Sequence, residues 1–533
     1  MKSADIIKAY DARILERRNI EEIWDLIERF IFPFGGQFQG QSGPIDYKKR
    51  EVYDSTGINA NQLLASNIQS SLTNPIAKWA NYGFGNSKLQ KNQEAMKWRQ
   101  ECEYAVMNDI RTSNYHNEAG EFYLDLTGFA TGIQTQEPLE DGQGGLKTIV
   151  SDTVPPGECC FDLDLMGFPK NFYRCLKWKA HQIIEKFGKD NVPEKIKKEA
   201  ESPIESITEH NVIYCVWKRN NGSIDTFSIQ PIDKRPYGAK YVLHETKEQL
   251  GEETGYYEMP AHMAQWRTLS GSDWGFSPAM IAIWDVLNIN EMNEMILAVG
   301  AKVLDPALMT TNKGVYGDID LSSGGLTVVS DMNAMQAFES KARFDVSQMN
   351  KADLKQSIRE TFYWDQLQLK DSPAMTAYEV QQRIQLMQRL IGPTYGRLQS
   401  HYLDPLLERR FKILYRYKKL PPMPGIVQDE GGDLIINYIG PLASAQRMEE
   451  IRVIESVLRG VGELESVYPG VTDNIDADVS VRELVTAQGA PAQMLKSTDA
   501  VKDIRDKREA QQQEMMELEK AKLAKEGQAE NAK

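Results

Sequence analysis

The spacing of apolar side chains changes part-way along this chain of 533 residues, and this change limits the fold more than any other feature. Over residues 122–240, short runs of alternating or β-branched residues are separated by turn-forming Gly and Asn, which is typical of strands. Most of the remaining chain places its apolar residues at helical intervals. The sequence therefore predicts a mixed α+β protein that is mostly α-helical.

Long helical segments flank the strand-rich region. The predicted helices cover residues 4–30, 57–73, 90–113, 278–301, 344–369 and 375–418. We expect a break in the first helix near Arg18-Asn19. We expect a bend in the last helix at Gly392-Pro393, because proline disfavours helix at the residue before it. A strand is predicted at Leu434–Tyr438.

Local signals also divide the strand-rich region. Asn220-Asn221-Gly222 lies between two strand-like runs and predicts a hairpin turn. His181–Phe187 predicts a short helix, which Gly188 would end. The region is therefore expected to be α+β, with a hairpin and a short helix inserted among its strands.

The composition is that of a well-packed protein that needs no disulfide or metal for stability. Apolar residues make up 41% and charged residues 26% of the chain. No apolar run approaches the roughly 20 residues that span a bilayer, so no membrane partner is expected. The net charge of −14 gives no general drive to hold DNA phosphates. The five cysteines, with Cys159 and Cys160 adjacent, fit reduced and mostly buried residues.

No catalytic, cofactor-binding or metal-binding motif stands out. The pair Gly188-Lys189 is followed by Asp, which rules out a P-loop there, and none of the six histidines stands at ligand spacing. Segments that begin at Asp318 and Asp476 imitate calcium loops but lack the required Gly and Glu. We therefore predict no catalytic residue, no cofactor and no metal. A soluble hydrolase that uses paired carboxylates is the alternative, since an acidic chain always offers such pairs.

The stretch from Tyr53 to Trp79, YDSTGINANQLLASNIQSSLTNPIAKW, opens like an aspartic protease motif. That chemistry needs Asp-Thr-Gly or Asp-Ser-Gly twice, so that two aspartates share a proton. Here the order is Asp-Ser-Thr-Gly, and it occurs once. Asp54 or Ser55 can instead accept a hydrogen bond from a free N–H group of a first helical turn. The motif therefore predicts the start of a closely packed helix and no chemistry.

The same stretch begins a resemblance to a known family. Tyr-Asp-Ser-Thr-Gly, the Ala- and Leu-rich helix, Leu72-Thr73-Asn74-Pro75 and Trp79 resemble the head-to-tail connector family, the portal proteins of short-tailed, podovirus-type bacteriophages. Further matches are Trp274-Gly275-Phe276-Ser277-Pro278, Asp305-Pro306, Met375-Thr376-Ala377, Gly392-Pro393 and Gly396-Arg397-Leu398-Gln399. The resemblance covers about residues 18–420.

The resemblance implies a ring, usually dodecameric, at one capsid vertex. It implies a wing, a stem around a channel, a clip and a crown. Carried onto this chain, the parts are the N-terminal wing at 1–277, the first stem helix at 278–301, the clip at 302–342, the second stem helix at 343–369, the channel loop at 370–375, the C-terminal wing at 376–440, and the crown with a helical tail at 441–533.

The implied function is a non-enzymatic portal through which the viral genome is packaged and later ejected. The implied partners are further copies of this chain, the terminase large subunit, tail adaptor and tail tube proteins, the major capsid protein and scaffold, internal core proteins, and double-stranded DNA that passes without sequence specificity. The implied location is the head–tail junction of the virion, after assembly in the bacterial host cytoplasm.

Three sets of residues are candidates for this function. The expected channel-lining residues are Asp285, Glu291 and Glu294 of a helix without Lys or Arg, together with Lys370, Asp371 and Ser372. An acidic wall would let DNA slide, although these acids could equally face solvent or a neighbour. The candidates for packing between subunits, or within one chain, are Trp284, Leu287, Ile358 and Phe362. The candidates for docking at the clip are Asn312, Lys313, Tyr316 and Asp318.

The second stem helix carries bases as well as acids. Lys351, Lys355 and Arg359 dilute its negative charge, as does Lys370 beyond it. They could pair with acids of an adjacent subunit or form basic rings in the channel. The sequence leaves both arrangements open.

Overall fold

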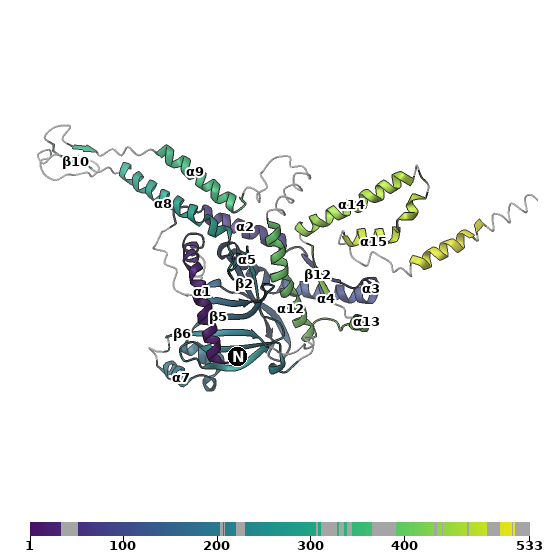
Figure 1. Ribbon diagram of the computed structural model, residues 1–533, viewed down its shortest axis with the longest axis horizontal. Helices are drawn as coiled ribbons and strands as arrows, with labels where there is room; N and C mark the ends of the chain where they lie inside the picture. Colours follow the sequence, from purple (N-terminus) through teal and green to yellow (C-terminus); the bar gives the residue numbers. More distant parts are fainter. Residues whose placement is uncertain are drawn as a thin grey trace, which may run out of the picture. The chain divides into compact units, whose positions relative to one another are not determined.

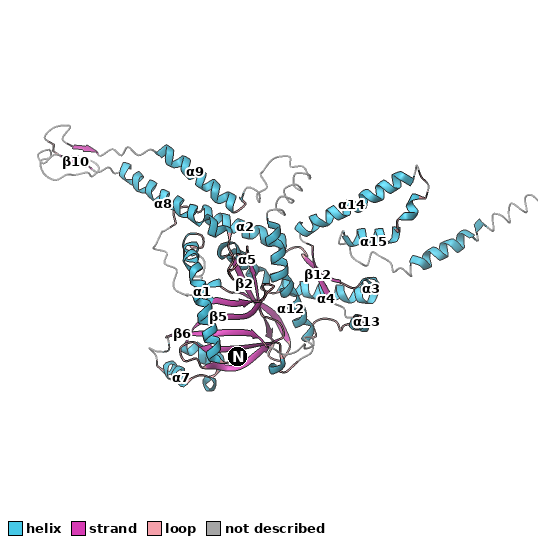
Figure 2. Cartoon of the chain, viewed as in Figure 1, coloured by secondary structure: helices cyan, strands magenta, loops and turns pink. Residues whose placement is uncertain are grey.

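The computed structural model describes residues 1–33, 52–202, 206, 208–219, 230–304, 308–310, 328–329, 335–337, 344–364, 391–430, 434–439, 441–465, 468, 470–487, 501–513 and 515–516. The chain forms two compact units: Met1–Pro75 with Asp109–Tyr417, and Ile76–Asn108 with Lys418–Lys533 (Figure 1). The predicted mixture of helix and sheet is confirmed (Figure 2). The second unit takes residues that the predicted domain boundaries assign to the wing.

A five-stranded antiparallel sheet forms one end of the first unit. Its strands follow one another in sequence order: β4 (Cys159–Leu163), β5 (Pro169–Lys179), β6 (Glu209–Lys218), β7 (Tyr237–Leu243) and β8 (Gln249–Tyr256). The expected hairpin turn at Asn220-Asn221-Gly222, between β6 and β7, lies outside the described residues. Each strand pairs antiparallel with its neighbour in the sequence.

Helix α1 (Ser3–Phe30) covers one face of this sheet. Ile6, Ile7 and Tyr10 are buried against a core of strand residues that includes Tyr173. The expected break near Arg18-Asn19 is wrong, because α1 is continuous. The buried side chain of Arg17 fixes the middle of the helix to the sheet, since its Nη1 donates to the carbonyl of Cys159 at 2.8 Å.

Helices α6 (Ala180–Phe187) and α7 (Glu194–Glu201) cover the other face. Ile183 and Ile196 are fully buried in a separate apolar cluster with strand residues of the sheet. The prediction of a short helix here is confirmed. Gly188 ends it at a φ of +80°, a conformation that favours glycine.

The first unit also contains a three-stranded sheet. Its order is β3 (Leu146–Thr153), β2 (Thr131–Glu140) and β9 (Ala261–Gln265). Helix α5 (Tyr115–Phe129) packs beside it, and Phe122 of α5 stacks on Tyr402 at 3.8 Å between ring centroids.

Tyr402 belongs to a long helical segment that is described from residue 391. It passes through a π-helical turn at Gln399–Leu403 into α12 (Asp404–Arg416). The buried Arg410 anchors α12, because its Nε donates to Asp109 at 2.6 Å. The predicted end of this helix near residue 418 is confirmed, and its predicted beginning lies outside the described residues.

Helix α2 (Thr56–Leu72) packs against two further helices, α8 (Pro278–Leu304) and α9 (Phe344–Thr361). Beyond α8 and α9, the short strands β10 (Leu308–Thr310) and β11 (Met335–Ala337) pair with each other. The predicted helix to residue 369, of which residues 365–369 lie outside the described residues, is interrupted, because α9 ends at Thr361. Tyr363 there adopts a φ of +57°, which a helix cannot accommodate.

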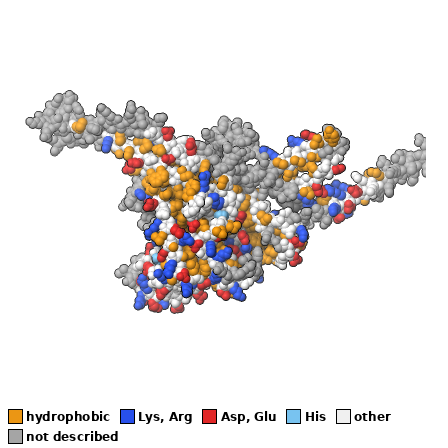
Figure 3. Space-filling model, viewed as in Figure 1, with side chains coloured by type: hydrophobic (Ala, Val, Ile, Leu, Met, Phe, Trp, Pro, Cys, Tyr) orange, Lys and Arg blue, Asp and Glu red, His pale blue; other side chains and the backbone are white. Residues whose placement is uncertain are grey.

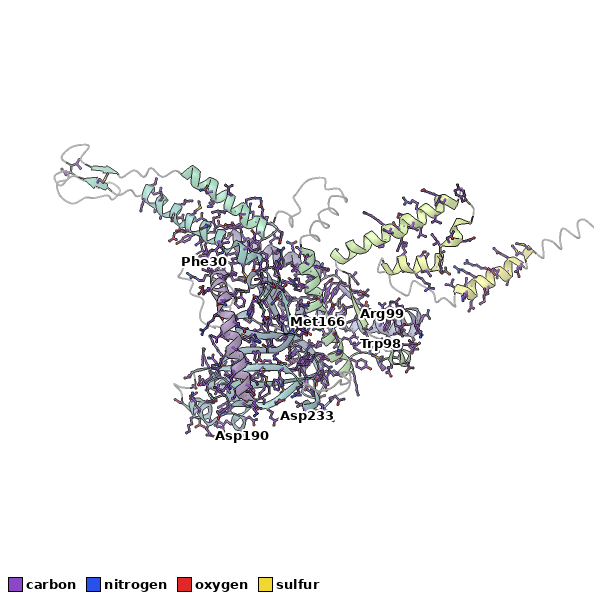
Figure 4. The ribbon with its side chains drawn as sticks, viewed as in Figure 1. Phe30, Trp98, Arg99, Met166, Asp190 and Asp233 are labelled. Atoms are coloured by element: carbon purple, nitrogen blue, oxygen red, sulfur yellow. The ribbon has the colours of Figure 1, made fainter. Side chains whose placement is uncertain are left out.

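The second unit contains strand β1 (Ala80–Phe84), which pairs antiparallel with β12 (Leu434–Tyr438), as the strand prediction for the latter required. Its helices are α3 (Ser87–Lys91), most of α4 (Gln93–Thr112), α13 (Gly425–Asp429), α14 (Pro441–Glu465), α15 (Ala477–Ala487) and residues 501–513. Trp98, labelled in Figure 4, donates its indole N–H to the carbonyl of Pro421 at 3.0 Å.

Among the described residues, every helix is too short or too polar to cross a bilayer.

Candidate functional site

Helices α8 and α9 lie side by side and antiparallel, and they project from the remainder of the first unit (Figure 1). Ser277 begins α8, because its hydroxyl accepts from the N–H of Met280 at 3.2 Å and donates to the carbonyl of Gly128 at 2.6 Å. The residues of α8 that are buried recur at helical spacing on one face: Pro278, Ala279, Ala282, Ile283, Val286, Ile289, Asn290 and Asn293. This stripe fastens the first half of α8 to its own chain.

Two amides at the end of this stripe hold the backbone that leads into α2. The N–H of Tyr53 donates to the Oδ1 atom of Asn290 at 2.6 Å. The Nδ2 atom of Asn293 donates to the carbonyl of Tyr53 at 3.3 Å and to Asp54 at 3.3 Å. Both amides are more than nine-tenths buried. Buried polar groups are stable only when they are paired, so these contacts fix the register of α8 against residue 53.

Asp54 joins three helices at this point. Its Oδ1 atom accepts from the N–H of Thr56 at 2.9 Å, and its Oδ2 atom lies 2.8 Å from the Nζ atom of Lys355 on α9. Burial alone would raise the pKa of Asp54, but the hydrogen bonds from Lys355 and Thr56 hold this pKa below its usual value. The prediction that Asp54 starts a helix is confirmed. Asp54 also binds α8 and α9 to α2.

Gly57 allows the first turn of α2 to approach α8 closely. A Cβ atom at Gly57 would lie only 2.9 Å from a methyl group of Val286. The predicted closeness of packing is therefore present at this residue. We name Asp54, Lys355, Asn290 and Asn293 the polar joint, because together they connect α2, α8 and α9.

The candidate acids occupy different positions. Asp285 is half-buried and accepts from the Ser357 hydroxyl of α9 at 2.7 Å, whereas Glu291 and Glu294 are exposed. A shallow groove of about 650 Å³ runs between the two helices. It is lined by Asp285, Asn288, Glu291, Met292, Met295, Asn350, Asp353, Leu354 and Ser357. The groove is therefore acidic, and it contains two exposed or half-buried methionines.

The four residues predicted to pack between subunits also differ. Ile358 and Phe362 are fully buried within this chain, Leu287 is half-buried, and Trp284 is 58% exposed. Hydrophobic atoms gather on the surface over the base of this helix pair (Figure 3). Trp284 thus remains available to another chain, while Ile358 and Phe362 already contribute to the core of their own.

Seven candidate residues lie outside the described residues. They are Lys370, Asp371 and Ser372 of the expected channel loop, and Asn312, Lys313, Tyr316 and Asp318 of the expected clip. Their predicted roles stay predictions.

The described residues contain no group of three or more His, Cys, Asp or Glu side chains that could hold a metal ion. Cys102, Cys159, Cys160 and Cys215 are buried, and burial raises the pKa of each thiol. A thiol that stays protonated is a poor nucleophile. These four cysteines are therefore reduced residues of the core, as the sequence predicts.

Sequence reasoning missed most of the polar joint. The signal available was the pair Asn290 and Asn293, which interrupts the apolar stripe of α8 at a spacing that places both amides on its buried face. Lys355 gave no such signal, because its partnership with Asp54 spans about three hundred residues of sequence.

Comparison with protein families shows which family the chain belongs to. The family model described as "Bacteriophage head to tail connecting protein" matches residues 3–495. The chain belongs to this connector family. Its family resemblance, first seen in the segment from Tyr53 onward, is thereby confirmed.

Two curated relatives of this connector carry the same kind of name. A probable portal protein of Bordetella phage BPP-1 is 25% identical over 515 residues, which cover 93% of this chain and 89% of the relative. The portal protein of Salmonella phage epsilon15 is 23% identical over 530 residues, which cover 96% and 92%. A chain from the virion of a native gene transfer agent particle aligns with a TM-score of 0.35 at 9% identity, over 88% of this chain and 94% of that one.

Proposed function

We propose that this connector is a portal protein, which forms a ring at one capsid vertex. The viral genome enters the head through this ring during packaging and leaves through it during ejection. The observation that carries the proposal is the family match over residues 3–495, together with two portal relatives that align over nearly the whole chain. The protein accordingly belongs at the head–tail junction of the virion.

In this proposal α8 and α9 are the stem helices of a ring, usually dodecameric, that surrounds the channel. The support is the contrast along α8, whose buried residues all lie within residues 278–293 and whose last eleven residues include none that are buried. Exposed apolar residues there include Met295 at 56% and Leu297 at 61%. Contact with a second copy of the chain would remove these side chains from water.

Glu291 and Glu294 are the best candidates to line the channel. Both are exposed, and α8 contains no Lys or Arg before Lys302. A wall of carboxylates repels phosphates, so DNA would slide past without being held. Asp285 is a weaker candidate, because Ser357 already takes one of its oxygens.

The proposed partners follow from the same function. The terminase large subunit would dock during packaging, and tail adaptor and tail tube proteins would dock afterwards. The major capsid protein, the scaffold and internal core proteins would surround the ring within the head. No observation among the described residues favours the alternative of a soluble hydrolase.

Negative-stain electron microscopy of the purified full-length chain tests this proposal. We expect rings with a central hole, whose rotational symmetry the images give directly. Because ring closure can need other head proteins, a second preparation is made in which the chain is co-expressed with the scaffold, and it is examined in the same way. Monomers or dimers under both conditions would contradict the proposal.

A further inference from the structure

Two arginines near the base of α8 lie together without a carboxylate partner among the described residues. Arg397, on the helix that leads into α12, donates from Nη1 to the carbonyl of Trp266 at 2.9 Å. Arg267 is the next residue after Trp266. It donates from Nη2 to the hydroxyl of Tyr363 at 3.4 Å. We name Arg267 and Arg397 the arginine pair.

Within the part of the chain that the structure describes, both guanidinium groups contact neutral groups. The Thr394 hydroxyl shares the Trp266 carbonyl with Arg397, at 3.0 Å. The guanidinium of Arg267 lies over the ring of Phe276, 5.9 Å from its centroid, and the N–H of Phe276 donates to the carbonyl of Arg267 at 2.9 Å. Each side chain is therefore anchored through one edge, and the described residues show no hydrogen bond from its other N–H groups, which could reach a ligand.

The two guanidinium groups carry the same positive charge and repel each other. Burial, and then the nearby positive charge of Arg267, lower the pKa of Arg397. Elsewhere in the described residues, buried or half-buried arginines such as Arg13, Arg17, Arg174 and Arg219 each have a carboxylate within 3 Å. Arg235 is likewise held by backbone carbonyls, those of Gln230 and Gly255, so the arginine pair is distinguished by two like charges that lie near each other in a chain whose net charge is −14.

A strained residue helps to position the pair. Tyr363 has a φ of +57°, which is unusual for a bulky residue, and this conformation ends α9 and directs the Tyr363 hydroxyl toward Arg267. Such strain persists only where surrounding contacts maintain it. The strained backbone at Tyr363 therefore accompanies the contact between its hydroxyl and Arg267.

We propose that the arginine pair binds a phosphodiester group of double-stranded DNA as the DNA passes the base of the stem. Planar guanidinium forks match phosphate oxygens in geometry and charge. In a ring of subunits the pair would repeat around the channel and give a basic contact at one level of an otherwise acidic wall. This inference rests on the proposed portal function, because it needs DNA in the channel.

The experiment measures the binding of a fluorescently labelled DNA duplex to the full-length chain by anisotropy, over a series of salt concentrations. Mass photometry of the same samples reports ring formation separately. The double variant Arg267→Gln/Arg397→Gln is compared with Lys147→Gln/Lys170→Gln, which removes the same charge from two exposed lysines.

We expect the arginine variant to bind DNA about tenfold more weakly and to lose ~2 from the slope of log affinity against log salt, since two phosphate contacts are lost. The lysine variant should bind like the wild type. Arg267→Gln alone leaves the Trp266 anchor of Arg397 intact, so it should fold normally and lose ~1 from the slope.

Equal DNA affinity for the two double variants, with rings intact, would overturn the inference. A loss of rings in Arg267→Gln, with unchanged DNA affinity, would also overturn it and would point to a carboxylate of a neighbouring subunit. The proposed portal function fails separately, if the wild-type chain forms no ring under any of these conditions.

Discussion

The two halves of α8 have the same secondary structure but opposite surroundings. The near half, residues 278–293, contains every buried residue of the helix. The far half, residues 294–304, contains none, and Leu297, Val303 and Leu304 are exposed by 61%, 51% and 89%. One face of the near half packs on its own chain, although Ile281 and Trp284 of this half are exposed by 54% and 58%, while the far half has no buried face.

This difference separates the apolar side chains of α8 that one chain can bury by itself from those that only contact with another chain could bury. Each apolar side chain left in water forgoes roughly 1.5–3 kcal/mol of burial free energy. In the near half the two buried amides are used internally, since Asn290 and Asn293 bind the backbone of Tyr53. In the far half the free energy of burying apolar side chains becomes available only when a second copy of the chain covers them.

The largest expected effect is on the near half. Ile283 is fully buried, so Ile283→Ala should lower the free energy of unfolding by about 2–5 kcal/mol through lost burial and the cavity that remains. Leu297→Ala in the far half is the matched control, and it should change this free energy by less than about 0.5 kcal/mol. Chemical denaturation of the dissociated chain measures both. Equal losses would remove the distinction between the halves.

Acid should weaken the region that supports the near half. His262 lies on β9, whose chain continues toward the start of α8, and burial, with a smaller effect of Arg409, lowers its pKa to about 3. The unfolded chain binds a proton below its ordinary pKa of about 6.5 while the folded chain does not, so stability falls as the pH drops from about 6.5 toward 3.

From pH 7 to pH 5 this single group should cost about 2 kcal/mol. The variant His262→Gln should lose correspondingly less over the same interval, as measured by denaturation at each pH. A pH dependence identical to that of the wild type would show that His262 is accessible to protons in the folded chain.

Removing the charge at the polar joint should have a moderate effect. Asp54→Asn keeps the shape of the side chain but leaves Lys355 without its partner, and we expect a loss of about 1–2 kcal/mol, since the lysine is one-third exposed. Because the folded pKa of Asp54 is lowered, its contribution is present above the ordinary pKa and is lost as the pH falls through the folded value.

Asp353→Asn is the control for that measurement, because Asp353 is exposed on the same helix as Lys355. It should change the free energy of unfolding by less than about 0.5 kcal/mol. If Asp54→Asn behaves like this control, the polar joint does not stabilise the attachment of α9 to α2.

The smallest effect on the isolated chain is expected for polar substitutions in the far half. Met295→Gln/Leu297→Gln should leave the free energy of unfolding unchanged within about 0.5 kcal/mol, since both side chains are already exposed. Ring formation, measured by mass photometry, should fall. Ile232→Gln, which alters an exposed apolar residue outside α8, should affect neither quantity. Normal rings from the double variant would show that the far half is not an interface.

The sequence predicted elements whose signals are local. The spacing of apolar residues gave α2 to within one residue at each end and α8 to within three, and Gly188 marked the end of α6. Asp54 was recognised as a helix start because its hydrogen bond to Thr56 spans only two residues. These features depend on neighbouring residues, which a reader of the sequence can see.

Features that depend on distant residues were missed or wrong. The expected break in α1 did not allow for Arg17, whose contact with the Cys159 carbonyl supports a continuous helix. The interruption after Thr361 was not predicted, because no signal in the local sequence indicates a left-handed conformation at Tyr363. The arginine pair also escaped notice, since Arg267 and Arg397 meet only in the folded chain.

Cryo-electron microscopy of the ring purified from heads assembled with this chain tests the central claim most directly. The account predicts a closed ring in which Met295 and Leu297 are covered by the adjacent subunit, while Glu291 and Glu294 face a central channel. A ring in which the far half of α8 stays exposed to solvent, or points away from the channel, would contradict it.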